Sequence, residues 1–186
     1  MEEPIRGLRE RLWHSLPRHQ RRVVRHRGSL TRLLRAFTRN DFRVRVLREG
    51  YQVPQPDEAM ALGLPPRQRA WVREVQLLGD GKPWVQARTV IPLHCLKGAN
   101  QRLRHLGNRP LGSALFGQQP WHREAFTCGQ TAPHQPSGPH PARRSRFRRG
   151  RCTLLVTECF LPLLWDDLRD QAVRRHPTHG DSLRPL

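Results

Sequence analysis

Long apolar runs are absent from this chain of 186 residues. Only 36% of its residues are hydrophobic, and no segment approaches the stretch of about 18 apolar residues that spans a membrane. A secretory signal is missing as well, because the first residues, Met-Glu-Glu-Pro, do not form a basic and then apolar pattern. We therefore expect a soluble, cytoplasmic chain that folds as one domain around one core.

Closely spaced cysteines are also missing. The four cysteines, at positions 95, 128, 152 and 159, form no C-x-x-C motif, and this excludes the commonest structural zinc sites. Cys128, His134 and His140 are conceivable metal ligands, but they are widely spaced in a stretch rich in proline and glycine. We interpret them as loop residues and expect no metal.

Lysine is nearly absent, since arginine supplies all but two of the 34 basic residues. The net charge of +19 is typical of proteins that bind nucleic acid. Phosphate binding gives no reason to exclude lysine, however, so the imbalance favours codon bias in a GC-rich genome. The basic run at residues 143–149 holds a single aromatic residue, Phe147, and we interpret it as a solvated run beside an edge strand.

Hydrophobic periodicity, capping residues and turn signals predict an α+β domain in which helices pack on an antiparallel sheet. Ser29 is a good helix N-cap, and the Asp80-Gly81 turn joins two alternating strands. The predicted elements are, in chain order, helices at 5–13 and 29–38, a strand at 42–47, a loop at 54–68, a hairpin at 69–91, helical turns at 100–106 and 111–116, a loop at 129–142 and a strand at 152–161.

Glu158 interrupts the most apolar of these strands. Strand alternation places it on one face with four apolar residues and no other charge, namely Cys152, Leu154, Val156 and Phe160. An ionised carboxylate that is buried without a partner is costly. Glu158 therefore needs a basic partner, an altered protonation state or a task in proton chemistry.

Arg73 shows the same anomaly, because it shares a strand face with Trp71, Val75 and Leu77. One interpretation is a buried ion pair between Arg73 and Glu158 with no further role. The other is a closed, mostly apolar cavity in which the arginine binds a substrate carboxylate and the glutamate manages a proton. Such a cavity would suit a small, anionic and partly apolar ligand.

Six blocks follow one another between about residues 29 and 162. They are Leu47-Arg-Glu-Gly-Tyr51, Trp71-Val-Arg-Glu-Val75, Asp80-Gly-Lys-Pro-Trp84 with Ala87-Arg-Thr-Val-Ile-Pro92, Arg109-Pro-Leu-Gly112 with Leu115-Phe116, Arg143-Arg-Ser145, and Leu154-Leu-Val-Thr-Glu-Cys-Phe-Leu-Pro162. Together these blocks resemble the bacterial chorismate pyruvate-lyase family.

The resemblance implies a single α+β domain with a six-stranded antiparallel sheet and flap-like helical segments over a buried site. It implies a cofactor-independent lyase that cleaves chorismate to 4-hydroxybenzoate and pyruvate for ubiquinone synthesis. By resemblance, Arg73 binds the ring carboxylate and Glu158 faces the ether or phenol oxygen. By the same resemblance, Leu111 and Leu30 line the site and offer backbone N–H groups. Family members often carry methionine at the position of Leu30.

The resemblance divides the chain into a basic helical segment over 1–28, the lyase-like domain over 29–162 and a polar, poorly ordered tail over 163–186. The segment before Arg143 departs from the family, being longer and rich in proline. We expect a monomer that binds chorismate and 4-hydroxybenzoate and neither nucleic acid nor membrane.

Two other functions stay open. Effector domains of some bacterial transcription regulators share this fold and sense small molecules, but the roughly 28 residues before Ser29 are too few for a winged-helix domain. A nucleic-acid binder that uses the basic run is the less favoured alternative.

Overall fold

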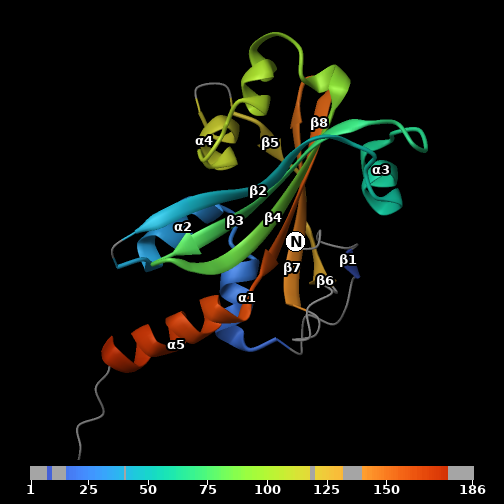
Figure 1. Cartoon of the computed structure of the whole chain (residues 1–186). Helices are drawn as coiled ribbons and strands as arrows, with labels where there is room; N and C mark the ends of the chain where they lie inside the picture. The colour runs from blue at the N-terminus through green and yellow to red at the C-terminus, as the bar shows by residue number, and fades with distance from the viewer. Residues whose placement is uncertain (1–7, 10–15, 40, 118–119, 132–139, 176–186) are drawn as a thin grey trace, which may run out of the picture.

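One antiparallel sheet forms the frame of the protein (Figure 1). The computed structural model describes residues 8–9, 16–39, 41–117, 120–131 and 140–175. Within these residues the strand order is β1-β6-β7-β8-β4-β3-β2, with β5 also paired to β7. The strands are β1 (Leu8–Arg9), β2 (Phe42–Gln52), β3 (Ala70–Gly79), β4 (Lys82–Pro92), β5 (His122–Arg123), β6 (Thr127–Thr131), β7 (His140–Arg149) and β8 (Cys152–Phe160). Six strands have at least five residues, as the family resemblance implies, and β1 and β5 are two-residue additions.

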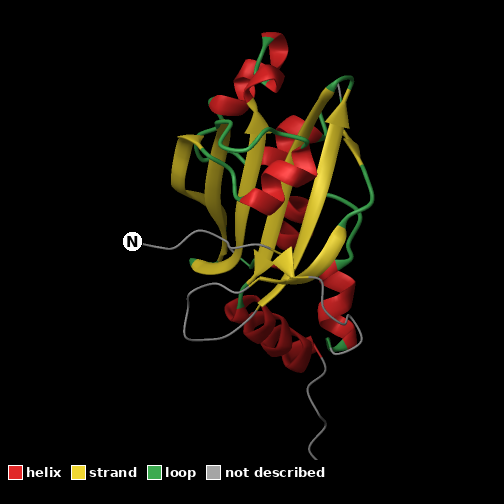
Figure 2. Cartoon of the chain, turned by 90° about the vertical axis from the view of Figure 1, so that its right-hand side faces the viewer, coloured by secondary structure: helices red, strands yellow, loops and turns green. Residues whose placement is uncertain are grey.

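Helices cover the two faces of the sheet unequally (Figures 1 and 2). Apolar side chains of α1, α2 and α5 form one cluster with β3, β4 and β8, and the turns around η2, η3 and α4 form a second one with β4, β7 and β8. Helix α3 packs on the opposite face, against Val72, Val90 and Leu155. The helices are α1 (Arg18–Val24), α2 (Leu30–Phe37), α3 (Pro56–Leu62), the 3-10 helices η2 (Leu93–Cys95) and η3 (Gly98–Arg104), α4 (Leu111–Leu115) and α5 (Pro162–Arg175).

The predicted hairpin is confirmed as β3 and β4. Asp80 and Gly81 both have positive φ angles, 51° and 82°, as a two-residue turn between antiparallel strands requires. The Asp80 carboxylate accepts hydrogen bonds from the backbone N–H groups of Arg39 (3.0 Å) and Asp41 (3.1 Å). The turn therefore also fixes the entry into β2.

The predicted helix after Ser29 is confirmed as α2. The Ser29 hydroxyl accepts a hydrogen bond from the backbone N–H of Arg32 at 3.3 Å, and the side chains of Leu30 and Leu34 are buried. The cap fixes the start of this helix, which covers part of the sheet face that carries Arg73 and Glu158.

The C-terminal region corrects the expectation of a poorly ordered tail. Helix α5 begins at Pro162, and its Leu164 and Trp165 are buried in the core. The Asp167 carboxylate accepts hydrogen bonds from Lys82 Nζ (2.6 Å) and Trp84 Nε1 (2.8 Å). Residues 161, 164, 165 and 168 are apolar at helical spacing, a signal that the polar composition of the tail obscured. Residues 176–186 lie outside the described part.

Three other predictions were wrong in part. The expected loop at 54–68 contains α3, which begins with a capping box between Gln55 and Glu58. The expected loop at 129–142 contains the end of β6 and the start of β7, while residues 132–139 are outside the described part. Of the expected helix at 5–13, the two described residues form strand β1.

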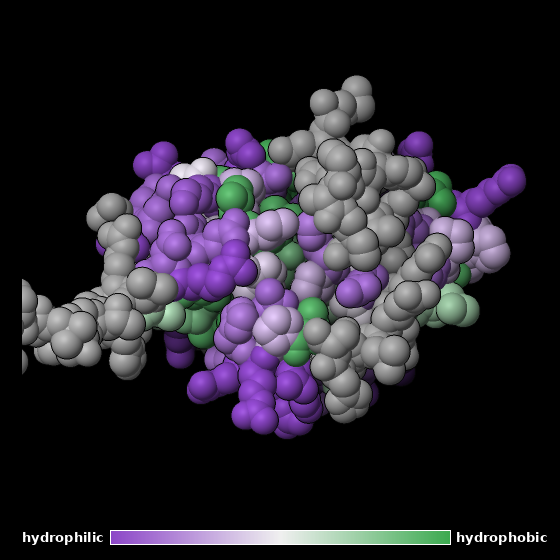
Figure 3. Space-filling model, turned by 90° about the horizontal axis from the view of Figure 1, so that it is seen from below, coloured by the Kyte–Doolittle hydropathy of each residue, from purple (hydrophilic) through white to green (hydrophobic). Residues whose placement is uncertain are grey.

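The basic run at residues 143–149 lies within β7, an interior strand between β6 and β8. Its Arg143, Ser145 and Phe147 are buried, so the prediction of a wholly solvated run was wrong. The outer surface is nevertheless strongly polar, and Figure 3, seen from below, shows mainly hydrophilic residues with scattered apolar patches. No helix in the described part of the chain is long and apolar enough to cross a membrane.

Candidate active site

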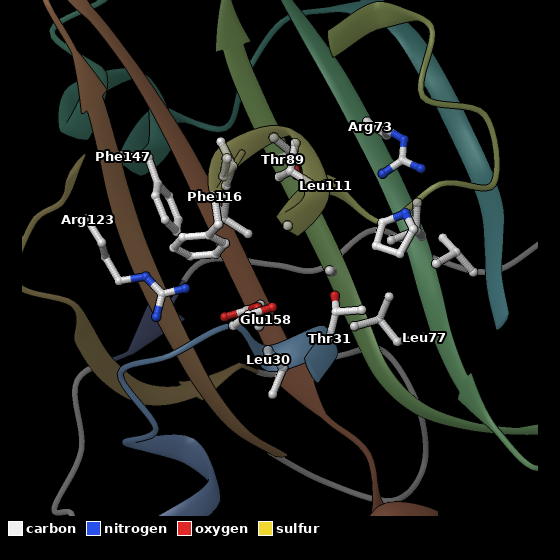
Figure 4. A pocket seen from close by; sticks show the side chains of 18 residues that line it. Leu30, Thr31, Arg73, Leu77, Thr89, Leu111, Phe116, Arg123, Phe147 and Glu158 are labelled. Carbon is white, nitrogen blue, oxygen red and sulfur yellow. The ribbon is translucent and has the colours of Figure 1, made fainter. Parts of the chain in front are cut away.

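A cavity lies between the sheet and the first residues of α2 and α4 (Figure 4). The centre of a water-sized molecule can occupy about 50 Å³ of it. All four residues that the sequence singled out line this cavity, namely Leu30, Arg73, Leu111 and Glu158. Its other walls are largely apolar and include Val75, Leu77, Ala87, Leu115, Phe116, Phe147 and Val156. Strand alternation therefore pointed to Arg73 and Glu158, and the family resemblance to Leu30 and Leu111, as residues of one cavity.

Glu158 has a basic partner, and this partner is Arg143. The two residues lie directly opposite each other on β8 and β7, and Arg143 Nε donates a hydrogen bond to Glu158 Oε2. Arg143 is fully buried, and its Nη1 donates to the backbone oxygens of Val24 (3.2 Å) and His26 (2.6 Å). The predicted pair between Glu158 and Arg73 is therefore wrong, and Glu158 faces the cavity as one half of a different ion pair.

Arg73 lies at the other end of the cavity from Glu158 (Figure 4). Its Nη2 donates to the backbone oxygens of Gly107 (2.6 Å) and Arg109 (3.2 Å), and its Nε is 3.4 Å from a carboxylate oxygen of Glu49 on the neighbouring strand β2. Burial lowers the pKa of Arg73, an effect that Glu49 opposes. Nε meets no hydrogen-bond geometry within the described residues, and Glu49 is its ion-pair partner.

Leu30 and Leu111 are the first residues of α2 and α4, and these two helix starts meet over the cavity. A Cβ atom at Gly112 would lie 3.4 Å from Ser29 Oγ and 3.5 Å from Thr31 Oγ1. The first N–H groups of a helix have no partner within the helix. The first residues of both helices therefore bring backbone N–H donors to the side of the cavity opposite the sheet.

Arg123 is a lining residue that the sequence did not reveal. It follows His122 in the two-residue strand β5, which has no detectable periodicity. Its guanidinium carbon lies 4.7 Å from the ring centroid of Phe147 and 5.5 Å from that of Phe116. Burial, and then the positive charge of Arg143, lower the pKa of Arg123, while the Glu158 carboxylate raises it.

A second group of buried charges lies on the opposite face of the sheet, under α3. Arg88 donates to both carboxylate oxygens of Glu58, from Nε at 2.7 Å and from Nη2 at 2.9 Å. Its Nη1 donates to Glu74, which also accepts from Arg48 Nη2 at 3.1 Å. This group is closed on itself, because every nitrogen of the Arg88 guanidinium is used.

The buried thiols are poor candidates for nucleophiles. Burial raises the pKa of Cys95 and of Cys128 to about 12, and that of Cys159 to about 11. A thiol with such a pKa stays protonated near neutrality. Among the described residues no group of three or more metal-ligating side chains lies close together, and the conceivable ligand His134 falls outside them. The chemistry that the cavity offers is that of one carboxylate and two guanidinium groups.

Comparison with known families gives a match to the amino-acid sequence. A family model described as chorismate lyase matches residues 13–170. A protein named probable chorismate pyruvate-lyase from Marinobacter nauticus is 52% identical over 138 residues, which cover 74% of this chain and 73% of that protein. One with the same name from Methylococcus capsulatus is 44% identical over 149 residues, covering 75% of this chain and 92% of that protein.

Solved structures share the fold at low sequence identity. The effector domain of PhnF from Mycobacterium smegmatis superposes with a TM-score of 0.52 at 12% identity, over 73% of this chain and 89% of that one. A transcriptional regulator of the GntR family from Bacillus cereus gives 0.51 at 9% identity, over 67% and 94%. At these identities the likeness concerns the fold alone.

Proposed function

The chain belongs to the chorismate lyase family, and we propose that the cavity between Arg73 and Glu158 is its active site. As a member of this family it is a carbon–oxygen lyase that eliminates pyruvate from chorismate. The observation that supports the assignment of the site is the placement of a guanidinium and a carboxylate at opposite ends of one mostly apolar cavity. The product that remains is 4-hydroxybenzoate, a precursor of ubiquinone.

The reaction asks little of the protein beyond positioning. The ether bond at C3 of the ring breaks, the hydrogen at C4 leaves, and the enol that departs gains a proton and becomes pyruvate. No water or cofactor enters this balance, and the ring becomes aromatic. Arg73 binds the ring carboxylate, which fixes the ring within the cavity. The apolar walls then hold the ring in its reactive conformation and exclude water.

Glu158 acts at the other end of the ring. Its ion pair with Arg143 presents the carboxylate as a hydrogen-bond acceptor. In this form it accepts the hydrogen bond of the ring hydroxyl, which becomes the phenol of the product, and lies beside the bond that breaks. The backbone donors at Leu30 and Leu111 complete the contacts from above.

A small-molecule sensor and a nucleic-acid binder find less support. The curated relatives are named lyases at up to 52% identity, whereas the regulators resemble the chain in fold at 9% and 12%. A nucleic-acid binder would use the whole basic run, but Arg143 is fully buried in the ion pair with Glu158, and the exposed Arg146 and Arg148 are both paired with Glu124.

A turnover assay tests the proposal directly. We expect the purified protein to release 4-hydroxybenzoate and pyruvate in equal amounts from chorismate, with no loss of rate when a chelator is added. Arg73→Ala should lower kcat/KM by about 100-fold or more, since it removes a charged contact to the substrate. Arg69→Ala removes a charge from an exposed position and serves as the matched control. Binding of 4-hydroxybenzoate by a protein without turnover would instead indicate a sensor.

The setting of the enzyme is part of the same proposal. Every group that we assign to the cavity comes from one chain, so a monomer can be active. The four cysteines are free thiols, which suits the reducing cytoplasm. Light scattering of the purified protein checks the monomer.

A further inference from the structure

Arg123 lies at the Glu158 end of the cavity, whereas Arg73 lies at the far end (Figure 4). The proposed function gives Arg73 the ring carboxylate of chorismate and leaves its second carboxylate, on the enolpyruvyl group, without a partner. The ring hydroxyl is opposite the ring carboxylate, and the enolpyruvyl ether is on the next carbon. A ring held by Arg73 and Glu158 therefore directs the enolpyruvyl group to the surroundings of Glu158.

The guanidinium of Arg123 is held in place and still has an open edge. Its Nη1 donates to the backbone oxygens of Arg27 (3.1 Å) and Gly28 (3.3 Å), and the rings of Phe116 and Phe147 flank it. Its Nε is buried and has no hydrogen-bond partner within the described residues. Nε and Nη2 form the edge with which an arginine binds a carboxylate through two parallel hydrogen bonds. This edge is thus preorganised.

The charges around Arg123 also favour an anion. At this end of the cavity the two guanidinium groups of Arg123 and Arg143 face one carboxylate, Glu158. The other nearby carboxylate, Glu124, is paired with Arg146 at 3.3 Å and Arg148 at 3.5 Å. Positive charge is therefore in excess around Arg123, and the carboxylate of a ligand would offset part of it.

We propose that Arg123 is a substrate-binding residue that holds the enolpyruvyl carboxylate of chorismate and so selects a dicarboxylate over ligands that carry the ring carboxylate alone. Arg123 also lines a separate open cleft with Arg25, Arg27 and Glu124. The carboxylate that it holds is the one that leaves with pyruvate.

The inference rests on the proposed function, and substrate and product separate the two. Chorismate carries both carboxylates, whereas 4-hydroxybenzoate carries the ring carboxylate alone. We expect Arg123→Gln to lower kcat/KM for chorismate by about 50-fold, the value of a charged hydrogen bond. The Kd of 4-hydroxybenzoate, measured by calorimetry, should change by less than about fivefold. Arg73→Gln should weaken both.

Two further variants serve as controls. Arg148→Gln removes the same charge from an exposed position on β7 and should leave both measurements unchanged within about fivefold. Arg123→Lys keeps the charge without the two-pronged edge, so we expect an intermediate loss of kcat/KM of about tenfold. It also takes the place of Arg123→Gln if the latter does not fold, as judged by circular dichroism.

The outcomes discriminate between the two proposals. If wild type does not turn over chorismate, the proposed function fails and the inference fails with it. If wild type is active and Arg123→Gln keeps its kcat/KM, the inference alone is overturned. A loss of turnover together with an equal loss of 4-hydroxybenzoate affinity would also overturn it, because Arg123 would then support the whole site.

Discussion

The two faces of the sheet both bury arginine and carboxylate side chains, yet they differ in how completely these groups are paired. Under α3, all three nitrogens of the Arg88 guanidinium donate to Glu58 or Glu74. On the cavity face, Arg123 Nε and Arg143 Nη2 are buried and have no hydrogen-bond partner within the described residues. Buried polar atoms without partners are uncommon in folded proteins and costly to keep.

The difference separates a structural ion group from a binding site. A buried ion group that satisfies its own hydrogen bonds has no capacity left for a ligand. The cavity face instead keeps a buried donor, Arg123 Nε, that is available to a ligand. Buried charge on a strand is therefore a weak indicator of function by itself, whereas buried charge with unused donors beside a cavity is a stronger one.

The largest expected effect comes from the same substitution made on each face. Glu158→Gln should lower kcat for chorismate by about 1,000-fold, because it removes the negative charge, and with it the proton-accepting capacity, beside the breaking bond. Glu74→Gln changes an equally buried, arginine-paired carboxylate under α3 and should leave kcat within about fivefold. Initial rates of 4-hydroxybenzoate release measure both. Equal rates for Glu158→Gln and wild type would remove Glu158 from the mechanism.

The next largest effect concerns stability, and it is expected for the face under α3 and not for the cavity face. Arg88→Met should lower the free energy of unfolding by about 3 kcal/mol or more, because Glu58 stays buried without its cation and Glu74 keeps only the exposed Arg48 as a partner. Urea unfolding measures this loss, and kcat of the folded fraction should not change. The triple variant that combines Arg88→Met with Glu58→Gln and Glu74→Met should recover most of the stability, since these three buried charges are then absent. If Arg88→Met is as stable as wild type, the closed group contributes nothing.

The smallest effect is a dependence of stability on pH. Burial lowers the pKa of His26 and of His140 below the ordinary value of 6.5, and Arg143 and Arg123 lower that of His26 further. The folded state thus binds fewer protons than the unfolded state, so stability is complete above pH 6.5 and falls as the pH drops below it.

Urea unfolding between about pH 5 and 8 tests this dependence, because the two states differ in bound protons only in that range. Each of His26→Gln and His140→Gln should flatten the profile. Salt screens the repulsion between charges but does not change the effect of burial. A salt concentration of about 1 M should therefore reduce the contribution of His26 to the pH dependence and leave the contribution of His140 unchanged. A profile that is flat in wild type would contradict the prediction.

Alternation along the strands was sufficient to find two members of the site. Glu158 and Arg73 are charged residues within apolar strand faces, and the period of two places them on the same side of the sheet. The hairpin of β3 and β4 followed from its turn residues. These signals are local, so a single sequence contains them.

The partners of these residues could not be predicted from the sequence, because pairing between strands is not local. Arg143 lies in a basic run, and only the register of β7 against β8 brings it opposite Glu158. Arg123 sits in a strand too short for any period. Helix α3 was hidden by Pro56, which reads as a loop signal although proline is favoured in the first turn of a helix.

The arginines of the cavity also hold the backbone that covers it. Arg73 binds the carbonyls of Gly107 and Arg109 just before α4, and Arg123 binds those of Arg27 and Gly28 just before α2. A ligand carboxylate on either guanidinium would thus be linked to the position of one covering segment. We therefore expect a ligand carboxylate at either end of the cavity to stabilise the covering segment at that same end.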